Sequence, residues 1–432
     1  SGAAGQTDLN VIIDRNLLPE DGRWSVNGYL KLTDGTIKPD KNRRAVESVH
    51  GTINFKGRQA SIDDGRLRLG ASAFALDGIV ANILDPEALY RLRAAQLNLA
   101  DLDLLAGGSA IQLKNFNAKG KAHFDNGALR LDGAALASEG RLADIDFQKM
   151  SAEFAWSTAG LTLRNLSLRA LDGNLRAEGY LASGGANSAP VELSAQVEAI
   201  AMRALLARLT PMAHDRVQGQ LDGRGRFAVS SAQGAKTQSA LEGSGEAMVR
   251  NGLIKDFNLI SQLLLRGSGA AVSAQSAARL PPGFAKLLSR TDTPFDSLKA
   301  DFVVEPARIR TDNLVIQTPD YSITGAGWVG FDRTTRWNGL IVLSPRLTQE
   351  VQRDMRQLRY LLDRRGRLAI TFRVDGAIPN VRIRLDNRAL AQTLRGGTPA
   401  RDGAPESADR SSQESSSDKK WLPDAVERFF NR

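Results

Sequence analysis

An alternating pattern of apolar and polar residues, bounded by glycine-containing turns, recurs along the chain. It is plain at residues 65–69 (Gly-Arg-Leu-Arg-Leu), 127–131 (Gly-Ala-Leu-Arg-Leu) and 381–385 (Val-Arg-Ile-Arg-Leu). Successive residues of a β-strand point to opposite faces, so each repeat gathers its apolar side chains on one face. The pattern predicts a mainly β fold: a long curved antiparallel sheet of repeated hairpins, with one apolar and one polar face and a few short amphipathic helices.

Length and composition are consistent with such a sheet. A chain of 432 residues would ordinarily need two or three separate cores, whereas in a repeating sheet each hairpin needs only its neighbours. Aromatic residues make up only 6% of the chain, so we expect alanine and leucine to supply most of the apolar face. Cysteine is absent from the sequence, which excludes structural disulfides, thiol catalysis and cysteine-ligated metals.

The chain carries a net charge of +9, which raises the possibility of nucleic-acid or anionic-membrane binding. Its basic residues, however, mostly occupy the polar positions of alternating strands, as Arg66, Arg68, Arg382 and Arg384 do. This arrangement is typical of a solvated sheet face. Because the basic residues are dispersed and aromatic stacking platforms are lacking, we expect no nucleic-acid partner, and attraction to anionic lipid head groups is the better functional interpretation.

We divide the chain into four parts. Residues 1–189 are the N-terminal part of a repeated-hairpin β-groove, and residues 190–395 are a second part in which helices interrupt the strands. Residues 396–420 are rich in Gly, Ser, Asp and Glu, which predicts a disordered linker. Because the chain opens in mid-pattern without an initiator methionine or a signal peptide, we expect a longer protein whose membrane anchor lies upstream.

Local signals predict where the strands are interrupted. The dipeptide Asp85-Pro86 is a helix-start signature, and other helices are indicated by apolar spacing or by a proline at the start. The expected helices cover residues 85–93, 200–209, 256–266, a short segment from Pro281, and 345–364. Asp or Asn followed by Gly predicts turns at residues 63–65, 125–127 and 251–252.

Residues 421–432 predict an amphipathic C-terminal helix. Two interpretations remain open: the helix packs back on the rest of the chain, or it docks on a membrane surface or a partner groove. The apolar face of this helix consists of Trp421, Leu422, Val426, Phe429 and Phe430.

The familiar motifs of enzymes and cofactor sites are missing or out of context. Residues 325–330 match G-x-G-x-x-G, but a turn and another strand follow where a dinucleotide site needs a helix. His50, His123 and His214 are far apart and lack metal-ligand spacing. No serine lies in a G-x-S-x-G elbow. We therefore expect no metal, no cofactor and no enzymatic activity.

Several segments resemble, in order, the C-terminal region of AsmA-like proteins. They are residues 241–245 (Leu-Glu-Gly-Ser-Gly), 249–260, 295–298, 308–314 and 324–327 (Thr-Gly-Ala-Gly), and the sequence Arg-Val-Asp-Gly-Ala-Ile-Pro-Asn at 373–380 resembles the closing motif with its Pro and Asn exchanged. The resemblance is best over about residues 190–390. The chain departs from the family in lacking the anchor helix, and the helix at 345–364 and the Ser-rich tail are additional.

The resemblance implies a bridge-like lipid-transfer protein with a repeating β-groove. Such proteins are anchored in the inner membrane of Gram-negative bacteria, extend into the periplasm, and function in phospholipid transport and outer-membrane biogenesis. The partners implied here are phospholipid acyl chains, the inner membrane through the upstream anchor, and outer-membrane or periplasmic proteins.

An apolar sheet face gives a physical reason for lipid binding that is independent of the resemblance. Protecting an acyl chain of about 16 carbons from water is worth on the order of 12 kcal/mol. We expect a lipid-conducting groove lined by Leu314, Ile316, Leu368, Ile370, Phe372, Val381, Ile383 and Leu385.

Two other interpretations stay open. The first is a structural or regulatory scaffold for outer-membrane assembly, in which helices 256–266 and 346–364 plug the groove. The second is a glycan-active enzyme, which would need two carboxylates converging in a cleft. The regular turn positions of Asp and Glu argue against the enzyme.

Overall fold

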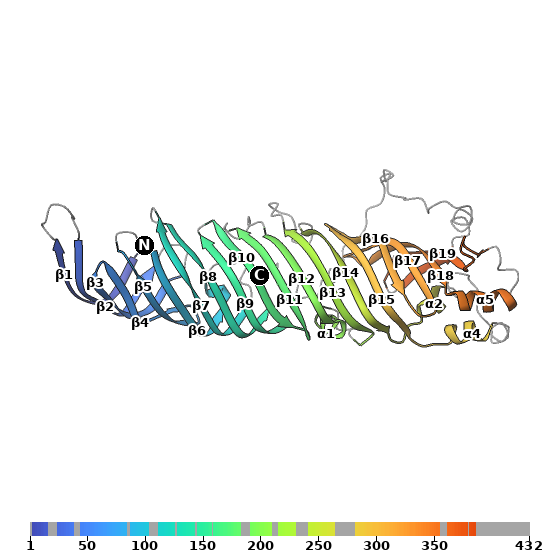
Figure 1. The fold of residues 1–432 in the computed structure, drawn as a ribbon, viewed down its shortest axis with the longest axis horizontal. Helices are drawn as coiled ribbons and strands as arrows, with labels where there is room; N and C mark the ends of the chain where they lie inside the picture. Colours follow the sequence, from blue (N-terminus) through green and yellow to red (C-terminus); the bar gives the residue numbers. More distant parts are fainter. Residues whose placement is uncertain are drawn as a thin grey trace, which may run out of the picture. The chain divides into compact units, whose positions relative to one another are not determined.

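The computed structural model describes residues 2–15, 24–38, 44–83, 87–102, 111–125, 128–142, 145–157, 159–182, 191–209, 215–229, 241–263, 281–354, 361–378 and 380–385. Their strands form one open antiparallel sheet of 20 strands with a few short helices (Figure 1). The mainly β fold expected from the alternation is therefore confirmed. The chain divides into two compact units, described in turn below.

The first unit contains the described residues up to Glu198, together with those of 226–241. Each strand from β1 to β12 pairs with the next along the chain. The elements are β1 (Gly2–Arg15), β2 (Trp24–Lys38), β3 (Val46–Gly57), β4 (Gln59–Leu69), β5 (Ser72–Val80), β6 (Glu87–Asn98), the 3-10 helix η1 (Leu99–Leu102), β7 (Ile111–Asp125), β8 (Ala128–Leu142), β9 (Ile145–Ser157), β10 (Gly160–Ala170), β11 (Gly173–Ala182) and β12 (Val191–Ala201).

The second unit contains the described residues of 199–225 and 242–385. Strands β14 to β20 again pair consecutively. The elements are α1 (Met202–Leu209), β13 (Val217–Val229), β14 (Leu241–Ile254), α2 (Leu259–Ser261), α4 (Pro282–Leu288), β15 (Thr293–Glu305), β16 (Arg308–Gln317), β17 (Tyr321–Gly330), β18 (Thr334–Leu343), α5 (Pro345–Asp354), β19 (Ala369–Ala377) and β20 (Asn380–Leu385).

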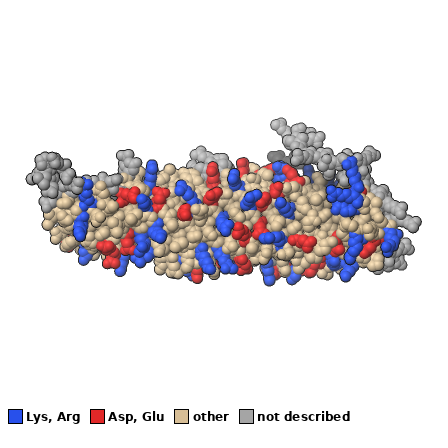
Figure 2. All heavy atoms as spheres, in the orientation of Figure 1, with Lys and Arg blue, Asp and Glu red and all other residues tan. Residues whose placement is uncertain are grey.

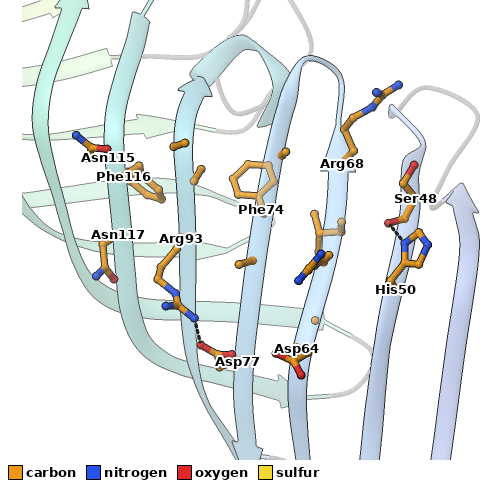
Figure 3. A pocket seen from close by; sticks show the side chains of 17 residues that line it. Ser48, His50, Asp64, Arg68, Phe74, Asp77, Arg93, Asn115, Phe116 and Asn117 are labelled. Carbon is orange, nitrogen blue, oxygen red and sulfur yellow. Dashed lines mark hydrogen bonds and ion pairs between the residues drawn. The ribbon is translucent and has the colours of Figure 1, made fainter.

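Many strands contain a bulge where one residue adopts a left-handed backbone. Asp64 (φ 58°) lies within β4 and Asn251 (φ 51°) within β14, and the β4–β5 register shifts between Ile62 and Gly65. The expected turns at 63–65 and 251–252 are wrong, since these residues lie inside β4 and β14, and Asp and Asn tolerate the left-handed region within a strand as well as at a turn. Bulges bend strands, and the strands around Asp64 curve visibly (Figure 3).

Several strand glycines lie directly opposite an aromatic residue of the neighbouring strand, whose ring occupies the space that a glycine side chain leaves empty. A Cβ added to Gly252 would overlap the ring of Phe295, which lies directly opposite on β15. Each ring covers the backbone that a glycine leaves bare. The same pairing recurs at Gly140–Phe147, Gly245–Phe302, Gly327–Trp337 and Gly339–Phe372.

The helix expected at residues 85–93 is wrong. Residues from Glu87 onward belong to β6, where Tyr90 and Leu92 are partly buried between the exposed Leu89, Arg91 and Arg93. Partly buried and exposed residues alternate through this segment, and this strand pattern outweighs the local helix-capping signal of Asp85-Pro86.

The long helix expected at 345–364 is only partly correct. It begins at Pro345 as α5, but Leu362 forms an isolated bridge with Leu368, so the helix does not continue to residue 364. The Asp363 carboxylate accepts hydrogen bonds from the amides of Arg365 and Arg367, which stabilises a turn in place of a helix.

The other expected helices are found where the structure describes them. Helix α1 lies within 200–209, α4 starts beside Pro281, and α2 is the described α-helical part of 256–266. The linker 396–420 and the segment with Trp421, Leu422, Val426, Phe429 and Phe430 lie outside the described residues.

Candidate functional site

Two rows of directly opposed residues cross the first unit on one face of the sheet. Neither row contains a charged residue, and this face is called the apolar face below. Row A consists of Leu9, Leu30, Ile53, Ile62, Gly78, Tyr90, Gly120, Gly133, Phe154, Leu163, Gly179 and Leu193 on β1 to β12. Row B runs parallel on β2 to β11, two residues away in each strand, and consists of Gly28, Phe55, Ala60, Val80, Ala88, Ala122, Leu131, Trp156, Leu161 and Leu181. At about 4.8 Å per strand, row A extends for roughly 50 Å.

The apolar face of the first unit has little cover. Leu9 and Leu193 are 66% and 37% exposed, and Tyr90, Phe154 and Leu163 are partly exposed. Within the described part of this unit, η1 is the only helical element, and its Leu99 and Leu102 pack with a cluster around Leu97 rather than on the rows. A large apolar surface left open in this way marks a binding site.

The sheet curves around this face. Ala118, Ala122, Ala135 and Ala152 are almost fully buried, although no second layer of the first unit covers them among the residues that the structure describes. On the opposite, polar face, residues such as Lys119 are exposed. Side chains are shielded in this way when they line the concave side of a bent sheet. The apolar face is therefore a trough.

The polar face carries charges of both signs. Figure 2 shows acidic and basic side chains interspersed over most of the visible surface. In the first unit they form cross-strand pairs, such as Lys121 Nζ with Glu87 Oε1 at 2.7 Å. The hydrogen bond from Lys121 is the main reason that the pKa of Glu87 is lowered. This face is suited to contact with water.

An open cavity of about 810 Å³ lies beside the bulged segments of β3 to β7 (Figure 3). Phe74 and Phe116 line it together with the polar groups of His50, Asp77 and Arg93. Arg93 Nη2 is 2.6 Å from Asp77 Oδ2, and His50 Nδ1 is 2.9 Å from the Ser48 carbonyl oxygen. These polar groups satisfy one another, so the cavity indicates no acid–base pair.

The histidines and the glycine-rich match, from which we expected no metal or cofactor site, lie on strands where the structure describes them. His50 and His123 lie on β3 and β7, whereas His214 lies outside the described residues. The structure contains no cluster of three potential metal ligands among the residues that it describes. Residues 325–330 belong to β17, and a turn leads from them into β18.

In the second unit, helices cover the apolar side of the sheet. Ile260 and Leu263 near α2, Leu287 of α4, and Leu347 and Val351 of α5 are nearly fully buried in one cluster with side chains of the sheet. This unit therefore has an ordinary core.

The residues predicted to contact lipid mostly belong to that core. Ile316, Leu368 and Phe372 are buried in the cluster, and Leu314, Ile370, Ile383 and Leu385 pack against it, while Val381 lies on β20 opposite Gly376. The structure thus brings seven of the eight together, but beneath the protein's own helices. The uncovered apolar surface lies in the first unit, on residues that the sequence analysis did not single out.

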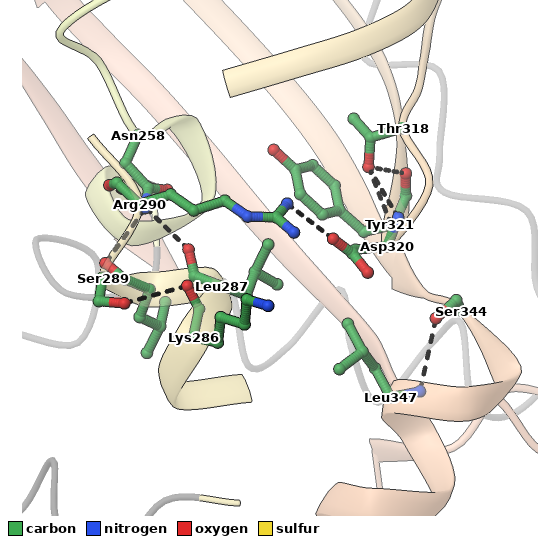
Figure 4. A network of polar contacts seen from close by, with 11 residues as sticks. Asn258, Lys286, Leu287, Ser289, Arg290, Thr318, Asp320, Tyr321, Ser344 and Leu347 are labelled. Carbon is green, nitrogen blue, oxygen red and sulfur yellow. Dashed lines mark hydrogen bonds and ion pairs between the residues drawn. The ribbon is translucent and has the colours of Figure 1, made fainter. Parts of the chain in front are cut away.

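A polar network fixes α2 and α4 on the sheet (Figure 4). Asn258 Nδ2 lies 2.9, 3.1 and 2.8 Å from the carbonyl oxygens of Leu287, Leu288 and Arg290, and its Oδ1 accepts from the amide of Ser261. Arg290 pairs with Asp320 at 2.7 Å, and burial raises the pKa of the adjacent Tyr321 to about 12. The cover of the second unit is held by specific contacts.

Comparison with protein-family models, curated proteins and solved structures gave no match. None of the described helices has the length and hydropathy needed to cross a bilayer.

Proposed function

We propose that this chain is a non-enzymatic lipid-conducting protein whose apolar face in the first unit holds acyl chains. The observation that carries this proposal is the pair of uncharged rows, roughly 50 Å long, that no other described layer of the unit covers. An acyl chain lying on the rows would cover their apolar side chains, and the rows would remove its methylenes from water at about 0.8 kcal/mol each.

Movement along the trough needs no chemical step. Every strand from β2 to β11 presents at least one apolar side chain in rows A and B, so an acyl chain exchanges one apolar contact for another as it slides from one strand to the next. Head groups stay in water at the trough's open side, and specificity for one head group is therefore low. The paired charges of the polar face keep the outside of the trough hydrated.

The resemblance to AsmA-like proteins supports the cellular setting of the proposal. We place the chain in the periplasm of a Gram-negative bacterium, attached to the inner membrane by a segment outside this sequence. There it carries phospholipids between the inner and outer membranes and contributes to outer-membrane biogenesis. Its partners are phospholipid acyl chains and outer-membrane or periplasmic proteins, and no nucleic acid.

A scaffold that carries no lipid is the second candidate. The covered apolar side of the second unit favours it, because α2, α4 and α5 occupy the surface that an acyl chain would need. If the scaffold proposal is correct, neither unit carries lipid; if the conduction proposal is correct, the second unit is a packed domain and only the first unit conducts lipid.

Lipid extraction distinguishes the two candidates. The protein is purified from a Gram-negative host without detergent and its bound lipids are quantified by mass spectrometry. Conduction predicts phospholipid at one or more molecules per chain, whereas a scaffold predicts none. Protein that is folded by circular dichroism and consistently free of lipid would rule out conduction.

A further inference from the structure

Two hydrogen-bond donors near the middle of the trough lack a partner among the described residues. They are Tyr90 Oη on β6 and Trp156 Nε1 on β9, and both atoms are shielded from solvent. Other tyrosine and tryptophan donors are satisfied: Tyr180 donates to the Ala159 carbonyl oxygen at 2.9 Å, and Trp337 Nε1 donates to Thr335 Oγ1 at 2.7 Å. A buried donor without an acceptor is costly and calls for an explanation.

The two donors belong to neighbouring positions on the apolar face. Tyr90 lies opposite Gly120, which lies opposite Gly133, and a Cβ added to Gly133 would be 2.8 Å from Tyr90 Oη. The Tyr90 side chain therefore reaches across β7 to β8. Gly133 lies opposite Phe154, so Trp156 is its diagonal neighbour at about 7–8 Å. Tyr90 Oη thus lies beside Gly133, and Trp156 occupies a neighbouring position on the same face.

The surroundings select a neutral acceptor. On the apolar face, the positions beside Gly133 are occupied by Leu131, Ala135 and Phe154, and rows A and B contain no cation. A phosphate or carboxylate would lose its hydration there without a counter-charge. Burial, with a smaller contribution from Asp132, raises the pKa of Tyr90 to about 12, so its hydroxyl keeps its proton at neutral pH.

We propose that Tyr90 and Trp156 hold the ester carbonyl oxygens of an acylated glycerol lipid beside Gly133. These carbonyls are the neutral acceptors nearest to the acyl chains, so they reach the two donors when the chains lie along rows A and B. The inference rests on the proposed function and adds a preferred resting position within the trough, between β6 and β9.

An ester–ether competition tests the inference. The full chain is equilibrated with vesicles containing equal amounts of an ester-linked phosphatidylglycerol and its dialkyl ether analogue, which has the same head group and chain length. Bound lipids are then quantified by mass spectrometry. A neutral hydrogen bond contributes about a fivefold factor, so two predict an ester preference of about 25-fold.

Conservative variants assign the preference to the two donors. Tyr90→Phe should reduce it to about fivefold, and Tyr90→Phe combined with Trp156→Phe should abolish it. Tyr180→Phe is the matched control, because that hydroxyl already bonds to the chain on the polar face, and it should keep the full preference. In lipid-free protein, Tyr90→Phe should raise the thermal midpoint, since it removes a hydroxyl without a partner.

The possible results distinguish failure of this inference from failure of the proposed lipid conduction. Equal binding of ester and ether lipids by the unaltered protein overturns the inference and leaves conduction standing. A lower thermal midpoint for Tyr90→Phe also overturns it, because the hydroxyl would then have a partner within the protein. Failure to bind either lipid overturns both proposals.

Discussion

A single charge placed in the trough should interrupt lipid binding. Leu163 lies near the middle of β10 in row A, opposite Phe154 on β9 and Gly179 on β11. Its side chain is partly exposed, so Leu163→Asp puts a carboxylate where a sliding acyl chain would pass without opening a closed core.

The size of the effect follows from the strand spacing. One strand occupies about 4.8 Å of the trough, which corresponds to roughly three or four methylenes of an acyl chain. Losing their contact at about 0.8 kcal/mol each removes about 3 kcal/mol of binding free energy, or on the order of a 100-fold decrease in lipid affinity. The folded protein should lose less stability, since the carboxylate stays in contact with water.

The assay measures transfer of a fluorescent phospholipid between donor and acceptor vesicles, together with the lipid that co-purifies. The matched control is Thr162→Asp, one residue earlier in the same strand, whose partners Ala155 and Tyr180 lie on the polar face. We expect transfer to fall about 100-fold for Leu163→Asp and to stay unchanged for Thr162→Asp. If folded Leu163→Asp transfers and retains lipid like the unaltered protein, rows A and B are not the route.

Three further predictions concern the frame that shapes the trough and its cover. Asn258→Ala should lower the free energy of unfolding of the second unit by about 2–3 kcal/mol, because three carbonyls and the Ser261 amide of α2 lose their partner. Urea unfolding measures this change, and an unchanged urea midpoint would contradict the role of Asn258. Asn115 adopts a left-handed backbone (φ 51°), so Asn115→Val should lower the free energy of unfolding by about 1–2 kcal/mol. The control Asn117→Val, in the regular part of β7, should change it little. Equal effects of the two variants in thermal denaturation would contradict the left-handed requirement at Asn115. The pKa of Glu305 is lowered, chiefly by its hydrogen bond from Arg308. The ionised carboxylate therefore stabilises the fold at pH values above its usual pKa of 4.5, and this stability is lost as the pH falls through the lowered pKa. Glu305→Gln should reduce the loss of unfolding free energy at acidic pH, and an unchanged pH dependence of unfolding would refute the assignment.

Alternation allowed the fold class to be predicted because it is a strictly local signal. Every second residue of a strand shares a face, so a repeat such as 65–69 determines both the element and the side that is buried. The same alternation runs through Tyr90 and Leu92, but we expected a helix there because the Asp85-Pro86 cap motif was given more weight than the period.

The errors arose where one sequence motif serves two geometries. Asn251-Gly252 supplies a left-handed residue, and that residue fits the interior of β14 as well as a hairpin turn. Which of the two forms depends on whether the neighbouring strand continues past it, and this is decided by pairing with β15, far along the sequence.

The position of the open surface could not be read from the strands. Ile370 and Phe372 have the same alternation as Phe154 and Leu163, yet the first pair packs in the helix-covered cluster and the second lies in row A. What separates them is the docking of Ile260, Leu287 and Leu347, which depends on contacts between distant segments.

Pairing between consecutive strands gives the first unit a property that a closed barrel lacks. Among the described residues, strands β1 to β12 pair consecutively in chain order, so contacts are local and ordering can spread from any hairpin outward. Because neither edge must meet the other, duplicating or deleting a hairpin changes the length by about 10 Å and leaves the remaining registers intact. The number of hairpins therefore sets the length of this unit, and tandem duplication lengthens it one hairpin at a time.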